Sequence, residues 1–221
     1  MYSKELWGLS LSQQVYYIEA SIDLNRTKSV FNWDRINTNP LLVYCSLGSQ
    51  NYLYGGSRQF FQTVIDALAA RPDLQLLISV GKHVPTSSFS RIPPNVVIAN
   101  WVPQLEALQK SKIMITHGGL GTVKECIYFG VPMIVFPYYM DQPRNAVRIV
   151  SHGLGVRGKL ESVTVEQLLV LISKIEEDQQ YQRRIKQMGE VFRQAEEAGR
   201  GVKIIEKILS YKETKRSFGE A

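Results

Sequence analysis

The sequence predicts an α/β fold in which a parallel sheet is covered by helices on both faces. From residue 40 onward, short apolar runs alternate with longer segments whose apolar residues recur at helical spacing. The apolar runs are continuous and do not alternate with polar residues, as expected for strands that are buried on both sides. Glycine or proline follows several of the runs, at Gly48, Gly81 and Pro137. Together these patterns favour repeated strand–helix units.

The apolar runs give the strands in chain order. The first, LLVYCS, precedes the Gly48 turn, the second ends in Gly81, and the third is reached through Pro93 and Pro94. Strands are expected at residues 41–46, 74–80, 96–99, 112–116, 133–136 and 155–156. Ligands of such sheets bind beyond the carboxyl ends of the strands. We therefore expect the loops after Ser46, Val80, Ala99, Thr116 and Phe136 to line one cleft.

Helical spacing of apolar residues gives the intervening helices. Phe60, Phe61, Val64 and Leu68, for example, fall on one face of a helix over residues 57–70. The others are expected at residues 104–110, 121–129, 142–152, 165–175, 179–197 and 201–209.

The ends of the chain differ from this pattern. Residues 1–39 contain one possible strand, at 15–18, and a polar stretch with Phe31 and Trp33, so we interpret them as a linker or the remnant of a neighbouring domain. Residues 40–210 are the predicted ligand-binding domain. Residues 211–221 are polar and are expected to form a disordered tail.

Composition and charge limit the classes of protein that fit. Of 221 residues, 44% are hydrophobic and 21% are charged, which is typical of globular domains. No apolar run approaches the roughly 20 residues of a transmembrane segment, and no signal peptide is visible. Cys45 and Cys126 lie in apolar segments and are expected to be reduced core residues of a cytoplasmic protein. The net charge of +6 suits an anionic ligand, but no basic stripe with interleaved aromatic residues indicates nucleic-acid binding.

A glycine-rich loop follows the strand at 112–116 and reads THGGLGTVKE. Such a turn before a helix directs backbone amides and the positive end of the helix dipole at a phosphate. Thr122 is expected to contact the phosphate or to cap the helix. His117 either donates a hydrogen bond to a diphosphate or bonds to the backbone as a structural residue. Glu125 suits the hydroxyls of a ribose, unless it is an exposed helix residue.

Two flanking motifs complete the candidate site. In NWVPQ, Pro103 suits the first position of the helix at 104–110. Trp101 offers a flat face for a base, the alternative being a packed core residue. In GVPMIVFPYYMDQPRNA, Asp141 and Gln142 suit sugar hydroxyls, which both donate and accept hydrogen bonds. Asp141 also precedes a helical pattern, so it is equally a candidate helix cap.

From Trp101 to Asn145 the chain resembles the UDP-glycosyltransferase family, including the UDP-glucuronosyltransferase-like members. It contains the W-x-P-Q, T-H-x-G and G-V-P-M…P…D-Q-x-x-N-A blocks in that order, and the resemblance covers about residues 41–209. The resemblance implies the GT-B fold, in which the second of two Rossmann-like domains holds most of the nucleotide sugar. This chain corresponds to that C-terminal domain.

The resemblance also implies roles for individual residues. Trp101 stacks on the uracil and the Val102 backbone contacts it, while Gln104 and Glu125 bind the ribose hydroxyls. The diphosphate is held by His117 and by backbone amides, with Ser49 close by; these amides belong to Gly119, Leu120, Gly121 and Thr122. Asp141 and Gln142 bind the donor sugar. No metal and no cofactor are implied, and the co-substrate is a UDP-sugar such as UDP-glucose.

The chain departs from the plant members of the family. Many of these carry tryptophan and asparagine where this chain has Leu120 and Gly121, so the phosphate contact of that asparagine is absent. The GGLGT form is more similar to bacterial macrolide, antibiotic and sterol transferases. The donor sugar therefore stays open, as does the choice between UDP and thymidine diphosphate donors.

The general base of this family is a histidine near the start of the acceptor domain. The chain has only His83, His117 and His152, and residues 1–39 resemble the last stretch of that acceptor domain. We therefore expect no catalytic residue in this chain. We interpret it as the donor-binding domain of an inverting glycosyltransferase, which binds nucleotide but turns over poorly alone. The alternatives are a subunit of a two-chain glycosyltransferase, like the split GlcNAc transferase of lipid-linked oligosaccharide synthesis, a non-catalytic UDP-binding module, or another GT-B activity such as a UDP-sugar epimerase.

Overall fold

The computed structural model describes residues 21–26, 30–37 and 41–217. The chain divides into two compact units, Leu24–Gly189 and the combination of Met1–Asp23 with Glu190–Ala221. The first unit holds the sheet. It begins earlier than the boundary at residue 40 that the sequence suggested. The possible strand at 15–18 lies outside the described residues.

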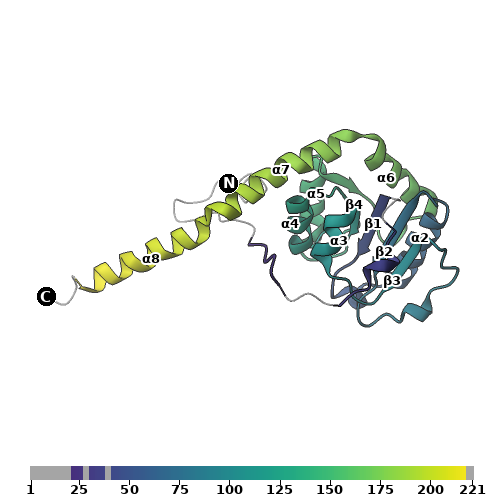
Figure 1. Ribbon diagram of the computed structural model, residues 1–221, viewed down its shortest axis with the longest axis horizontal. Coiled ribbons are helices and arrows are strands. Elements are labelled where there is room, and N and C mark those ends of the chain that lie inside the picture. The colour runs from purple at the N-terminus through teal and green to yellow at the C-terminus, as the bar shows by residue number, and fades with distance from the viewer. Residues whose placement is uncertain (1–20, 27–29, 38–40, 218–221) are drawn as a thin grey trace. The chain divides into compact units, whose positions relative to one another are not determined.

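Six parallel strands form one sheet in the order β3-β2-β1-β4-β5-β6 (Figure 1). Their bounds are β1 Leu41–Ser46, β2 Leu74–Ser79, β3 Val96–Ala99, β4 Ser111–Thr116, β5 Met133–Val135 and β6 Gly155–Arg157. The parallel α/β fold is therefore confirmed, and each strand lies within one or two residues of its prediction. Ser46 pairs with Ser79 on one side and with Thr116 on the other, so three strand ends lie level at the carboxyl edge.

Helices cover both faces of this sheet, as predicted (Figure 1). Helices α2 and α6 pack together over one face, and α3, α4 and α5 lie over the other. The helical bounds are α2 Ser57–Ala69, α3 Gln104–Lys110, α4 Leu120–Phe129, α5 Gln142–Ser151, α6 Val165–Glu177, α7 Gln179–Ala198 and α8 Arg200–Ser217. Short 3-10 turns, which the sequence analysis missed, are η1 Trp33–Arg35, η2 Asn51–Leu53 and η3 Thr86–Ser88.

The core lies mainly between the sheet and the helices α2 and α6. Val43, Leu76 and Ile115 of the central strands are fully or almost fully buried there against Phe61 and Ile172 of the two helices. Cys45 and Cys126 are both buried and free, which confirms their prediction as reduced core residues. The apolar runs thus form strands because both of their faces are covered.

The polar segment before β1 is attached to the sheet unit. The indole Nε1 of Trp33 donates to Glu106 Oε2 of α3 at 2.8 Å, and the ammonium of Lys110 lies 5.4 Å from the centre of the Trp33 ring. Gln75 Nε2 of β2 donates to the carbonyl of Arg35 at 3.2 Å. Residues 30–37 are therefore docked on α3 and β2.

The other unit is mainly helical where the structure describes it. The backbone amide of Ile22 donates to Glu196 Oε1 of α7 at 3.2 Å. Helix α8 runs to Ser217, well beyond the predicted helix end at Leu209. Within the described ranges, no helix combines the length and apolar character needed to cross a bilayer.

Candidate functional site

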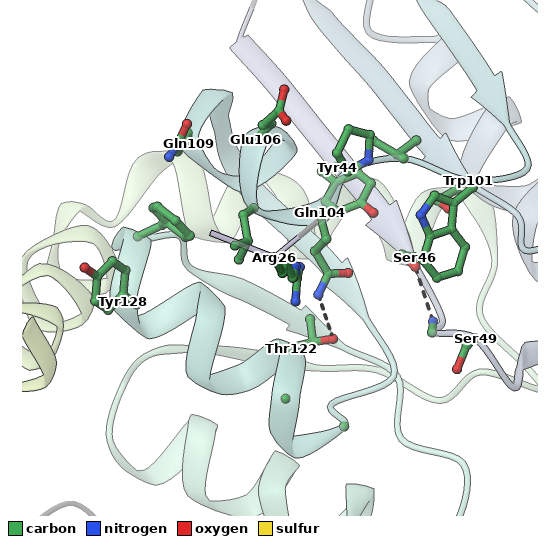
Figure 2. Close-up of a pocket in the computed structure, with 18 of the residues that line it drawn as sticks. Arg26, Tyr44, Ser46, Ser49, Trp101, Gln104, Glu106, Gln109, Thr122 and Tyr128 are labelled. Atoms are coloured by element: carbon green, nitrogen blue, oxygen red, sulfur yellow. Dashed lines mark hydrogen bonds between the residues drawn. The ribbon is translucent and has the colours of Figure 1, made fainter. Parts of the chain in front are cut away.

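A pocket of about 930 Å³ opens at the carboxyl edge of the sheet (Figure 2). Loops after β1, β2, β3 and β4 line it, as predicted; the loop after β5 supplies none of its described lining residues. Nine predicted site residues line the pocket: Ser49, Trp101, Val102, Gln104, His117, Gly119, Leu120, Gly121 and Thr122. The other three, Glu125, Asp141 and Gln142, do not.

Trp101 stands directly after β3, at the pocket wall. It is 49% exposed, so the alternative of a packed core residue is excluded. The ammonium of Lys82, from the loop after β2, lies 5.4 Å from the ring centre. Val102 is buried beside it. Pro103 was predicted to be the first helical residue, but it occupies the N-cap position of α3, one position earlier. The ring of Trp101 is therefore half exposed at the pocket, with the Lys82 ammonium over it.

Gln104 begins α3 and reaches across to α4. Its Nε2 lies 3.2 Å from Thr122 Oγ1 and 2.5 Å from Glu125 Oε2. Both predicted ribose ligands are thus bonded to each other. Glu125 is almost buried, and its Oε1 accepts a hydrogen bond from Arg26 at 2.6 Å, so it is not an exposed helix residue. The sequence analysis missed Arg26, because it lies in the segment interpreted as a linker.

His117 directly follows β4, and its ring lies between two glycines. A Cβ atom on Gly119 would lie 2.5 Å from His117 Nε2, and one on Gly48 would lie 2.8 Å from Cε1. Burial lowers the pKa of His117 to about 4, although the carboxylate of Asp141 partly opposes this effect. The imidazole is therefore neutral at pH 7. It lines the pocket, with Nδ1 3.4 Å from Thr116 Oγ1.

Helix α4 begins at Leu120, next to His117. Its N-cap is Gly119, and no side chain caps its backbone amides. Thr122 is turned toward Gln104 instead, so the capping alternative for Thr122 is wrong. Because the amides of a first helical turn have no intrahelical partner, this end of α4 offers donors and a positive dipole to an anion in the pocket.

The loop after β5 is held by hydrogen bonds between Gln142 and its own backbone. Gln142 is 4% exposed; its Oε1 accepts from the amides of Tyr138 at 2.9 Å and Tyr139 at 3.2 Å, and its Nε2 donates to the Tyr54 hydroxyl at 3.1 Å. Asp141 is exposed and occupies the N-cap position of α5 without a side-chain cap bond. Its Oδ2 accepts instead from Asn145 Nδ2 at 2.8 Å.

Three hydroxyl-bearing residues complete the floor of the pocket, and the sequence analysis did not single them out. Tyr44 and Ser46 line it from β1 (Figure 2), and Ser79 lines it from β2. Burial raises the pKa of Tyr44, so its hydroxyl stays protonated. Tyr44 lies within an apolar strand run, which indicated a core residue and nothing more. No group of three or more potential metal-ligating His, Cys, Asp or Glu side chains occurs among the residues described.

Known proteins resemble this chain over most of its length. The family model for UDP-glucoronosyl and UDP-glucosyl transferase matches residues 34–215. The NDP-glycosyltransferase YjiC of Bacillus subtilis (strain 168) is 36% identical over 168 residues, which cover 76% of this chain and 42% of that protein. The oleandomycin glycosyltransferase of Streptomyces antibioticus is 29% identical over 179 residues, covering 80% of this chain and 40% of that one.

Solved structures support the same relationship. The crystal structure of the glycotransferase of kitacinnamycin aligns with a TM-score of 0.73 and 29% identity, over 84% of this chain and 46% of that one. These matches confirm the predicted likeness to bacterial antibiotic transferases and the Rossmann-like fold. The chain spans less than half the length of each of these relatives.

Proposed function

The chain belongs to the UDP-glucoronosyl and UDP-glucosyl transferase family, and from this premise we propose that it is the donor-binding part of a UDP-sugar-dependent glycosyltransferase. One observation carries the proposal. A flat aromatic ring, a side-chain amide and an uncapped helix N-terminus, from Trp101, Gln104 and α4, line the same pocket, and the Gln104 amide is hydrogen-bonded to the carboxylate of Glu125. These three kinds of partner suit a base, a ribose and a diphosphate respectively.

The nucleoside end of the donor binds between α3 and the loop after β3. The uracil stacks on Trp101, where base stacking is worth about 1–3 kcal/mol, and its edge meets the Val102 backbone. The ribose hydroxyls lie against Gln104 and Glu125, where the carboxylate accepts and the amide donates.

The diphosphate lies at the start of α4. Neutral His117 donates one hydrogen bond to it, and the backbone amides of Gly119, Leu120, Gly121 and Thr122 donate others. Ser49, across the pocket, adds its hydroxyl. These donors are in place before the sugar leaves, so they stabilise the charge that develops on the leaving diphosphate.

The sugar end of the donor lies toward the loop after β5. Asp141 is the sugar ligand in this proposal, because its carboxylate is exposed and is close enough to His117 to influence its pKa. Gln142 contributes indirectly, since its amide holds the backbone of Tyr138 and Tyr139 and thereby sets the shape of this loop.

The acceptor and the general base come from outside these 221 residues, either from a further domain or from a second subunit. Neither His83 nor His152 lines the pocket; His117 lines it, and in this proposal it is assigned to the diphosphate. In the proposed reaction the acceptor oxygen attacks the anomeric carbon from the face opposite the diphosphate, so the configuration inverts. The isolated chain is expected to bind nucleotide without turnover.

Ligand-induced stabilisation tests the proposal directly. UDP at a hundred times its dissociation constant is expected to stabilise the chain by about 2.7 kcal/mol, through binding to the folded state alone. Thermal unfolding with millimolar UDP, uridine and pyrophosphate measures this, with ATP as the control for a pocket that accepts any nucleotide. An unchanged melting temperature with UDP would contradict the proposal. His117→Ala should weaken UDP more than uridine, because it removes a phosphate contact.

A further inference from the structure

An arginine from the segment before β1 enters the pocket and pairs with Glu125. Arg26 Nη1 lies 2.6 Å from Glu125 Oε1, while Gln104 holds Oε2 at 2.5 Å. Figure 2 shows the Arg26 side chain pointing into the pocket beside Gln104. The Glu125 side chain is 11% exposed and that of Arg26 is 43% exposed. The carboxylate is therefore clamped, with one hydrogen-bond partner on each oxygen.

This clamp solves two electrostatic problems of the pocket. An ionised carboxylate with little access to water is costly unless it is paired and hydrogen-bonded. A carboxylate at this place also repels the diphosphate that the pocket is proposed to hold. The Arg26 guanidinium offsets both effects because it is permanently charged. Since the two oxygens of a carboxylate offer about four acceptor sites, two bonds leave room for ribose hydroxyls.

Attachment of the segment to the domain does not account for Arg26. Residues 30–37 have their own anchor, in which Trp33 bonds to Glu106 and lies under Lys110. Arg26 instead lines the pocket, together with Leu24. Among the described residues, the ion pair of Arg26 is with the carboxylate of the proposed ribose site.

We propose that Arg26 is a positioning residue for ribose recognition: it pairs with Glu125 and holds the carboxylate in the orientation that accepts hydrogen bonds from the ribose hydroxyls. This inference rests on the proposed nucleotide site. It assigns a binding function to the stretch before the sheet, which supplies the third member of a cluster formed with α3 and α4.

The test compares two ligands that differ only in the ribose hydroxyls, UDP and 2′,3′-dideoxy-UDP, by titration calorimetry on the 221-residue chain. Arg26→Met is expected to weaken UDP about tenfold, the effect of losing one charge-assisted hydrogen bond, and dideoxy-UDP less than about threefold. Arg26→Lys keeps the charge and one donor, so it should recover most of the UDP affinity. Arg58→Met, which removes an equal charge outside the pocket, is the matched control and should change neither.

Each other outcome decides against the inference. Equal losses for both ligands would mean that Arg26 acts on the diphosphate or on the fold, and tighter UDP binding by Arg26→Met would make it a competitor of the ribose. If the wild type binds UDP and dideoxy-UDP equally, Glu125 does not bind ribose, and the nucleotide site survives without this cluster. If the wild type binds neither ligand, the proposed function fails as well. Thermal unfolding of each variant without ligand identifies a folding defect, which would also show in both ligands.

Discussion

Two neighbouring loops of the sheet begin alike and end differently. The β4–α4 loop, residues 117–119, and the β5–α5 loop, residues 136–141, leave paired parallel strands and lead into helices that no side chain caps. The first remains open to the pocket at α4. The second is closed by Gln142, which accepts from two backbone amides of its own loop. Polar residues after a strand thus either line the pocket or bond within their own loop.

Small residues make the first loop open. Gly119 and Gly48 leave room for the His117 ring, whereas the β5–α5 loop contains two tyrosines and passes through the left-handed region at Met140, where φ is 60°. Such a backbone is strained for a residue with a side chain. The Gln142 bonds hold it in that shape.

Gly119→Ala should have the largest effect, because it would remove the space that distinguishes the β4–α4 loop from the β5–α5 loop. The new Cβ would lie 2.5 Å from His117 Nε2, so the ring must leave its place beside the helix end. We expect UDP affinity to fall by at least about 100-fold, or about 2.7 kcal/mol, as contacts to an anion are lost. Titration calorimetry measures it. Gly55→Ala, whose Cβ meets Tyr138 at an ordinary 3.5 Å, is the control; equal losses in both would refute the steric reason.

Gln142→Ala tests the closed loop, and its main effect should be on stability. It leaves two part-buried backbone amides and the buried Tyr54 hydroxyl without this partner. We expect the free energy of unfolding to fall by about 3 kcal/mol, since each unsatisfied group costs about 1–3 kcal/mol. Urea denaturation measures this.

Gln50→Ala is the matched control for that variant, because Gln50 accepts a bond from the Tyr139 hydroxyl at the surface. The free energy of unfolding of Gln50→Ala should fall by less than about 0.5 kcal/mol. If Gln142→Ala left stability unchanged and instead abolished UDP-sugar binding while UDP still bound, Gln142 would be a direct sugar ligand.

Acid should lower the stability of the folded chain through His117 in the β4–α4 loop. Its pKa is about 4 in the folded chain, whereas the ordinary histidine pKa, which applies to the unfolded chain, is 6.5. The unfolded chain therefore binds more protons between these values, and stability falls as the pH falls. From pH 7 to pH 5 the loss is expected to be about 2 kcal/mol. Urea denaturation of wild type and His117→Gln at both pH values isolates it; a loss of the same size in the variant would assign the effect to other groups.

The sequence predicted the fold closely, because continuous apolar runs and helical spacing are local signals. The pocket was also predicted well, since parallel strands that end level bring Ser49, Trp101 and His117 to one edge. The direction in which a polar side chain points could not be predicted, because local sequence does not encode it. Gln142 is polar and follows a strand, yet it turns back on its own loop.

Long-range pairing explains the other omission. Arg26 and Glu125 lie far apart in the sequence, and nothing near Arg26 marks it as a site residue. An isolated arginine in a polar stretch is ordinarily a solvated surface residue. Arg26 reaches the pocket from a segment that also contacts α3 through the Trp33–Glu106 hydrogen bond, and neither contact can be read from the local sequence.

The placement of His117 between Gly48 and Gly119 has a consequence for how the protein matures. Gly48 follows β1 and His117 follows β4, and these strands meet only when distant parts of the chain have paired. Contacts of such large sequence separation form slowly, because a long loop has to close first. A partly assembled chain therefore has no complete anion site. The proposed nucleotide site is therefore complete only in chains whose central sheet has formed.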